Sequence, residues 1–228
     1  MSSLAKGLGL TVTMLFATPC LARGETLVEP SSEQEFERTP NIEGKPFLCL
    51  GAGVRKKVFF QIYAIDFCVE AQAGRAEIAK YLQSPDGRRH AGKKAEALAR
   101  SLREDEAFFA HVVSMPVEKS ADVVFVRDVT SQQLRDAFAW VLLQALGEEA
   151  RARIDAFVAM IDRDMKEGDR MTLRTKPSGE VMLDLGVPHQ VRDERLAYSL
   201  WQAYLGPESI IPDLKASIAE GTAVHATR

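Results

Sequence analysis

Two neighbouring apolar segments in the first third of the chain constrain its fold more than any other feature. They cover residues 46–53 (PFLCLGAG) and 58–69 (VFFQIYAIDFCV), and both have the composition of β-strands. In the second segment, apolar side chains occupy both sets of alternating positions, with Phe60 and Ile62 on one side and Phe67 on the other. A strand that is apolar on both faces needs cover on both faces. The two segments therefore predict central strands of a sheet that is packed between other layers.

The rest of the chain predicts hairpins and adjacent helices. Further strands are expected over 108–115, 123–129, 170–176 and 180–187, the last two as a hairpin around Pro177–Ser178–Gly179. Helices are expected between 74 and 108, between Thr130 and Gly147, from Ile154 to Met165, over 193–205 and over 212–220. Trp140 and Trp201 lie on or beside apolar helical faces, so we expect both to be packing residues. This order is typical of an α+β domain in which helices cover one face of a large antiparallel sheet.

The first 22 residues have the order of features of a signal peptide. Lys6 supplies a positive charge, residues 8–17 (LGLTVTMLFA) form an apolar run too short to span a bilayer, and Pro19 precedes small residues ending at Ala22. A buried N-terminal helix is the alternative. We expect cleavage near Ala22 and export to the periplasm or out of the cell.

The mature chain then divides into three parts. We expect residues 23–42 to be a tether or an edge strand, residues 43–220 to be the folded domain, and residues 221–228 to be a tail. No segment of the mature chain has the apolar length that a membrane span needs. The sequence does not indicate an oligomeric state.

The charge balance excludes a general polyanion binder. Lys and Arg number 29 against 32 Asp and Glu, for a formal net charge of −3, so no basic excess exists to displace phosphate counterions. We therefore expect no nucleic-acid partner.

Cysteine and histidine do not form a metal-binding pattern. Removal of the signal peptide leaves Cys49 and Cys68, which we expect to be buried free thiols, because a tight hairpin would place Cys49 opposite a residue near position 60. A disulfide in an oxidising compartment is the alternative. The spacing of the histidines, relative to each other and to the cysteines, does not match that of metal ligands. They are His90, His111, His189 and His225. We expect no metal and no other cofactor.

Three cations stand between the two apolar segments, in residues 53–57 (GVRKK). The glycines before them do not make a dinucleotide fingerprint, because Lys56 occupies the third glycine position and a strand follows. We expect these glycines to permit a bulge or a tight turn. The cations could be an exposed basic turn, or Arg55 could bind an anion with its forked guanidinium. No arrangement of serine, cysteine, histidine and acid predicts a nucleophile.

Four segments in this order resemble the chalcone isomerase family. They are FLCLGAGVRKKVFFQIYAIDFCVE, VVFVRDVTSQQLRDAFAWVLLQAL, KEGDRMTLRTKPSGEVMLDLG and ERLAYSLWQAYLGPESIIPDLKASI, and together they cover nearly all of residues 43–220. The chain is similar to a secreted bacterial branch of that family rather than to the plant enzymes. The resemblance implies an open-faced β-sandwich, with a long antiparallel sheet, a helical layer and a cleft between them.

The resemblance also assigns the cleft residues. Enzymes of the family close a flavanone ring, whereas related members bind fatty acids in the same cleft. Arg55 matches the cleft arginine, and Tyr63 stands where the enzymes carry threonine. Leu134, Ala137 and Val141 replace a tyrosine, a lysine and an asparagine of the enzymes, which removes the polar groups that would orient water and polarise the substrate.

The hypothesis that follows is a non-catalytic, exported protein that binds a small amphipathic carboxylate such as a fatty acid. Arg55 would hold the acid group, Tyr63 would donate a hydrogen bond, and Leu134, Phe138 and Val141 would line the tail. Two alternatives remain open. One is an isomerase with relocated catalytic groups, and the other is a structural or partner-binding module whose cleft is filled by its own side chains.

Overall fold

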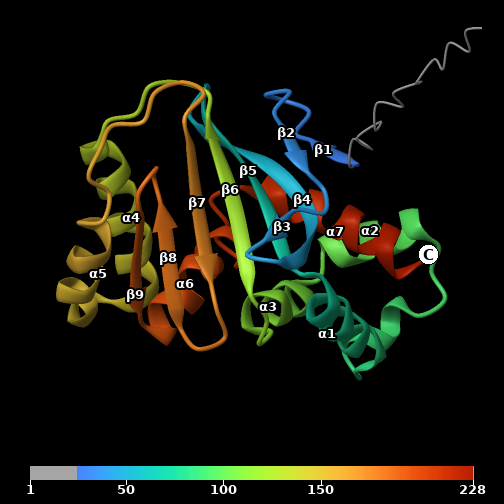
Figure 1. Cartoon of the computed structure of the whole chain (residues 1–228). Coiled ribbons are helices and arrows are strands. Elements are labelled where there is room, and N and C mark those ends of the chain that lie inside the picture. Colours follow the sequence, from blue (N-terminus) through green and yellow to red (C-terminus); the bar gives the residue numbers. More distant parts are fainter. Residues whose placement is uncertain (1–24, 228) are drawn as a thin grey trace, which may run out of the picture.

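An antiparallel sheet of seven strands forms the centre of the structure, in the order β3-β4-β5-β6-β7-β8-β9 (Figure 1). The structure is a computed structural model that describes residues 25–227, and the expected signal peptide lies outside the described residues. The strands are β3 (Asn41–Ile42), β4 (Lys45–Lys57), β5 (Phe60–Glu70), β6 (Lys119–Phe125), β7 (Arg170–Thr175), β8 (Glu180–Asp184) and β9 (Pro188–Arg192). A separate hairpin contains β1 (Thr26–Val28) and β2 (Glu35–Glu37).

Seven α-helices accompany the sheet within the described residues. They are α1 (Ala71–Gln83), α2 (Ala95–Arg103), α3 (Glu106–Ser114), α4 (Ser131–Leu146), α5 (Arg151–Val158), α6 (Glu194–Leu205) and α7 (Pro212–Ala226). The main core joins these helices to one face of the sheet, and a smaller core on the other face lies beneath the β1–β2 hairpin. The expected α+β architecture, with a large antiparallel sheet and a helical layer, is confirmed. No helix in residues 25–227 is long and apolar enough to cross a bilayer.

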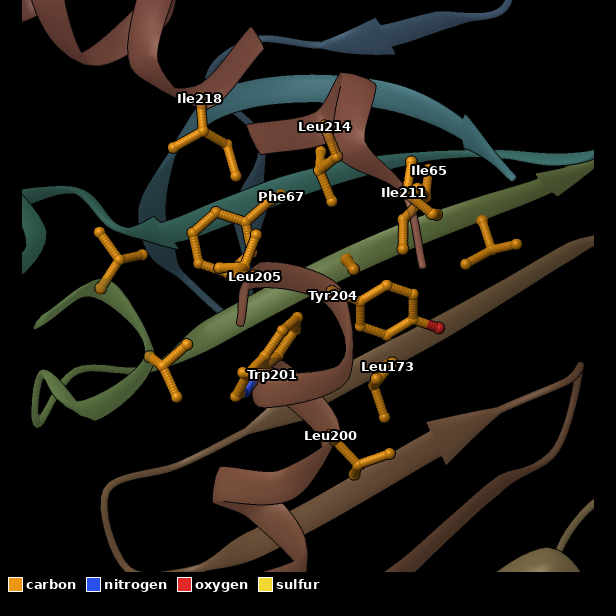
Figure 2. Close-up of a cluster of buried hydrophobic side chains, with 14 of the residues drawn as sticks. Ile65, Phe67, Leu173, Leu200, Trp201, Tyr204, Leu205, Ile211, Leu214 and Ile218 are labelled. Atoms are coloured by element: carbon orange, nitrogen blue, oxygen red, sulfur yellow. The ribbon is translucent and has the colours of Figure 1, made fainter. Parts of the chain in front are cut away.

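Helices α6 and α7 pack directly on the central strands (Figure 2). Trp201 of α6 is buried, its ring lies edge-on to Phe67 of β5 with centroids 5.3 Å apart, and its Nε1 donates a hydrogen bond to Thr175 Oγ1 at 2.7 Å. The expectation for Trp201 is therefore correct. The expectation for Trp140 is wrong, because its side chain is 60% exposed on the outer face of α4.

Glycines let α7 approach β4 at backbone distance. A Cβ built on Gly51 would overlap the backbone of Ile218 and lie 2.6 Å from the carbonyl carbon of Ser217. A Cβ on Gly221 would overlap the carbonyl oxygen of Leu50. The expected bulge is also present, since the β4–β5 register shifts between Cys49 and Gly51. Close packing of α7 is the second function of this glycine segment.

Four elements differ from the sequence expectations. Helix α5 ends at Val158 and not at Met165, which forms an isolated β-bridge with Val129. Residues 106–114 form α3 rather than a strand, because Asp105 caps the helix and apolar side chains recur at helical spacing. Helix α7 continues to Ala226, so most of the expected tail is helical, and Gly221, Thr222 and Ala223 within it are buried. Strand β9 extends the predicted hairpin into a three-stranded unit.

The turn between β4 and β5 lies further along the chain than predicted. Strand β4 continues to Lys57, and the turn consists of Val58 and Phe59, with Lys57 paired to Phe60. The three cations therefore end a strand, and apolar residues form the turn. This shift also changes the residue opposite Cys49, which is Cys68.

Cys49 and Cys68 form a disulfide, so the expectation of two free thiols is wrong. The cause is the position of the turn: with its centre at Val58 and Phe59, the two cysteines become cross-strand partners. The disulfide is buried under the β1–β2 hairpin. The Asp66 Oδ2 lies 3.2 Å from the Cys68 sulfur and 3.5 Å from the Cys49 sulfur.

Asp66 should make stability depend on pH. Burial raises the pKa of its carboxyl well above the usual value, and the charge of Asp122 raises it further. The folded protein thus holds a proton that the unfolded chain loses, so stability falls as pH rises from the unfolded pKa to the folded one, by at most about 1.4 kcal/mol per pH unit. Asp66→Asn keeps an oxygen for the Asp122 N–H, which Asp66 Oδ1 accepts at 2.7 Å.

We expect Asp66→Asn to lose less stability between pH 5 and pH 8 than the wild type, as measured by urea unfolding. Asp184→Asn serves as the control, because Asp184 caps a tight turn near the surface and its Oδ1 accepts from Gly186 N. Equal pH slopes for the wild type and Asp66→Asn would contradict the prediction.

Candidate functional site

Arg55 and Tyr63 lie opposite each other on β4 and β5. A register shift follows Arg55, so the strand bends where this side chain leaves the sheet. The Arg55 guanidinium is half-buried, and its Nη1 donates to the carbonyl oxygen of Ile210 at 2.6 Å. Ile210 belongs to the connection between α6 and α7. The structure therefore brings two of the predicted site residues together, beneath the helical layer.

Tyr204 of α6 completes a polar group at this position. Its side chain interacts with that of Tyr63, and burial raises the pKa of both phenols. The positive charge of Arg55 opposes both shifts. In Figure 2 the Tyr204 ring lies between Ile211 and Leu173, with its hydroxyl pointing away from Trp201. Sequence reasoning missed Tyr204, although it lies in the segment WQAYLG that carried the family resemblance.

The other predicted residues come from α4. Leu134 and Phe138 are buried in the same main core as Tyr63, and Phe138 lies edge-on to Phe157 with ring centroids 5.7 Å apart. Val141 is half-buried on the same helix. Helix α4 packs against α6, which carries Tyr204. The five predicted residues thus divide into a polar pair on the sheet and an apolar set on a neighbouring helix.

Two surface hollows lie away from Arg55 and Tyr63. One of about 290 Å³ is bordered by the β1–β2 hairpin and α7, with Leu27, Arg38 and Ser217 in its wall. The other, of about 470 Å³, lies between the end of α4 and α6, where Leu146 and Tyr198 border it. Neither hollow is lined by Arg55 or Tyr63.

A second polar network ties the helices α1 to α3 together. Asp105 accepts hydrogen bonds from the Tyr81 hydroxyl and Arg89, and its Oδ2 lies 2.6 Å from His90 Nε2. His90 Nδ1 in turn lies 2.8 Å from Ser101 Oγ. Asp105 also caps α3. The spatial order of serine, histidine and acid was not visible in the sequence. Ser101 lies within α2, and its hydroxyl also accepts a hydrogen bond from the Lys93 ammonium. We interpret the network as structural.

Within residues 25–227, one group of three potential metal ligands has its ligand atoms within 4.8 Å of one another: Cys49, Asp66 and Cys68. The disulfide bond occupies both sulfurs, so neither can be a thiolate.

Comparison with known proteins identifies the fold. A family model described as "Chalcone isomerase like" matches residues 45–219. The structure is similar to that of the Arabidopsis thaliana fatty-acid binding protein AtFAP1, with a TM-score of 0.70 and 18% sequence identity over 90% of this chain and 100% of the other. No curated protein matches the chain. The resemblance found in the sequence is thereby confirmed, and the chain belongs to the chalcone isomerase-like family.

Proposed function

We propose that this protein binds a small amphipathic carboxylate, such as a fatty acid, through Arg55. The observation that carries the proposal is a half-buried guanidinium whose one hydrogen-bond acceptor in the described structure is a carbonyl, that of Ile210, with two buried tyrosines beside it. Within residues 25–227 Arg55 forms no ion pair with a carboxylate. The fold shared with a fatty-acid binding protein supports the same assignment.

The binding step follows from the geometry of Arg55. A carboxylate would replace the Ile210 carbonyl as acceptor and form a charge-assisted, forked pair with the guanidinium. Tyr63 would donate to the second oxygen. The hydrocarbon tail would enter between the sheet and α4, against Leu134, Phe138 and Val141. Movement of the α6–α7 connection, which carries Ile210, would open this path.

The proposed role is binding without catalysis. The positions of α4 that match the polar groups of the enzymes carry Leu134, Ala137 and Val141. Hydrocarbon side chains cannot orient water or donate a hydrogen bond to a developing oxyanion. A tail-binding surface requires such side chains.

Export is part of the proposal. The Cys49–Cys68 disulfide supports an oxidising compartment, since such bonds persist outside the cytosol. The features of residues 1–22 point the same way.

Removing the guanidinium should weaken binding strongly. We expect titration calorimetry to detect dodecanoate or hexadecanoate binding to the wild type, and Arg55→Ala to lose about 10- to 100-fold in affinity. Lys56→Ala is the matched control, because Lys56 is the next cation along the strand and is exposed beside Asp213. Dodecanol, which has no carboxylate, should bind to the wild type with no higher affinity than to Arg55→Ala.

Two results would overturn the proposal. The first is the absence of fatty-acid binding by the wild type, or equal binding by Arg55→Ala. The second concerns catalysis: a loss of chalcone absorbance that is faster with the wild type than with Arg55→Ala would show isomerase activity.

A further inference from the structure

The turn between β4 and β5 exposes three consecutive apolar side chains. Val58, Phe59 and Phe60 are 78%, 93% and 61% exposed. Other large apolar side chains of the described chain that are exposed occur singly: Val28, Trp140, Val187, Tyr198 and Val224. Single exposed apolar residues are ordinary, but a contiguous group marks a site of interaction.

The backbone of this turn adds a second observation. Val58 has a φ of 59°, which lies in the left-handed region. Glycine and asparagine are common in this region, and β-branched residues are rare. A two-residue turn built for stability alone would carry one of those residues instead. Residues in such conformations cluster at functional sites.

Cations surround the exposed side chains. Lys56 and Lys57 precede them directly, and the guanidinium of Arg127 lies over the Phe60 ring, 4.9 Å from its centroid. Lys56 pairs at 3.3 Å with an exposed carboxylate, Asp213. Within residues 25–227 neither Lys57 nor Arg127 forms an ion pair. The tip is therefore apolar at its end, and two cations without an ion pair in residues 25–227, Lys57 and Arg127, lie at its base.

We propose that this tip, residues 56–60 with Arg127, docks onto a lipid bilayer that contains anionic phospholipids. Exposed phenylalanine rings gain from entering the boundary between headgroups and acyl chains. The cations at the base would then lie at the level of the lipid phosphates, which attract basic side chains. A groove on a protein could accept the two phenylalanine rings, but the cations Lys57 and Arg127, which form no ion pair within residues 25–227, favour a surface that carries many negative charges.

The position of the tip is consistent with docking. It lies at the end of the long strands opposite to the end where β5 continues into α1, at the upper edge of Figure 1. Arg55 is three residues from Val58, so docking would bring the proposed carboxylate site close to the bilayer surface. The inference stands without the proposed function, because it depends on exposure and charge at the tip and not on a ligand at Arg55.

Vesicle sedimentation tests this inference. We expect the purified protein to sediment with vesicles of equal parts phosphatidylcholine and phosphatidylglycerol, less with pure phosphatidylcholine, and less as salt is added. Phe59→Ser should reduce affinity for the mixed vesicles about tenfold or more, because one fully exposed ring is lost. Lys57→Gln should weaken binding and flatten its salt dependence.

Trp140→Ser is the matched control, since Trp140 is an exposed aromatic residue on α4, away from the tip. Trp140→Ser should bind the mixed vesicles with the affinity of the wild type, and all variants should keep the wild-type melting temperature. Every variant has the same N-terminal residues, so a difference between variants reports on the tip.

The inference is overturned if the wild type stays in the supernatant with mixed vesicles at low salt, or if Phe59→Ser binds as tightly as the wild type. It is also overturned if Phe59→Ser converts a dimer to a monomer in sedimentation velocity without changing vesicle binding, because the tip would then join two copies of the chain. Loss of fatty-acid binding in Arg55→Ala with unchanged vesicle binding would separate the two proposals.

Discussion

Replacing Gly51 with alanine is expected to lower the free energy of unfolding by about 3 kcal/mol. The added Cβ would overlap the Ile218 backbone and lie 2.6 Å from the carbonyl carbon of Ser217, so helix α7 as a whole would have to move away from β4. Backbone atoms cannot swing aside as the end of a flexible side chain can. The movement would also stretch the 3.0 Å hydrogen bond from Ala52 N to Ser217 Oγ.

Urea unfolding of Gly51→Ala measures this effect, with Gly44→Ala as the control. Gly44 has a φ of +81° and nothing within 4 Å of an added Cβ, so its replacement costs only the backbone strain, about 1 kcal/mol. A loss at Gly51 no larger than the loss at Gly44 would show that α7 is not held at backbone distance from the sheet.

Elements with strong local signals could be predicted from the sequence. Thr130 and Gln133 form a capping box at the start of α4, with Gln133 N donating to Thr130 Oγ1 and Thr130 N donating to Gln133 Oε1. The Pro177–Ser178–Gly179 turn joins β7 and β8 where its composition indicated. In both places a few neighbouring residues determine the backbone conformation, so it can be predicted without knowledge of distant contacts.

Elements that depend on distant contacts could not be predicted. The aromatic and β-branched composition of α3 favours a strand, and the cap at Asp105 together with packing on α6 decides for a helix. The position of the β4–β5 turn is a similar case. Polar Lys56 and Lys57 are ordinary turn residues, whereas Val58 adopts a left-handed conformation that composition does not suggest.

The candidate site was predictable only in part. Family resemblance supplied Arg55 and Tyr63, and the register of β4 and β5 places them opposite each other. Tyr204 and the Ile210 carbonyl reach the same place from the other end of the chain, through α6 and the loop that follows it. Contacts between such distant segments arise from tertiary packing, which periodicity and composition do not encode.

The Cys49–Cys68 disulfide has the second largest expected effect. Its cysteines are 19 residues apart in sequence, and a cross-link over a loop of this length restricts the unfolded chain by about 3 kcal/mol. We expect the double replacement Cys49→Ala with Cys68→Ala to lower the free energy of unfolding by that amount. Alanine is preferred to serine, because a hydroxyl beside the buried Asp66 would need a new hydrogen-bond partner.

Reductant provides the control for this prediction. Dithiothreitol should destabilise the wild type in urea and leave the double variant unchanged, because the variant has no bond to break. If both proteins respond alike to dithiothreitol, or if the double variant is as stable as the wild type, the disulfide does not contribute to stability.

Because β4 and β5 run side by side from the turn to Glu70, the cross-link restricts mainly the unfolded chain and adds little to the geometry of the folded one. The disulfide would therefore be expected to slow unfolding less than it speeds folding, since it holds the two central strands near each other before the rest of the sheet forms.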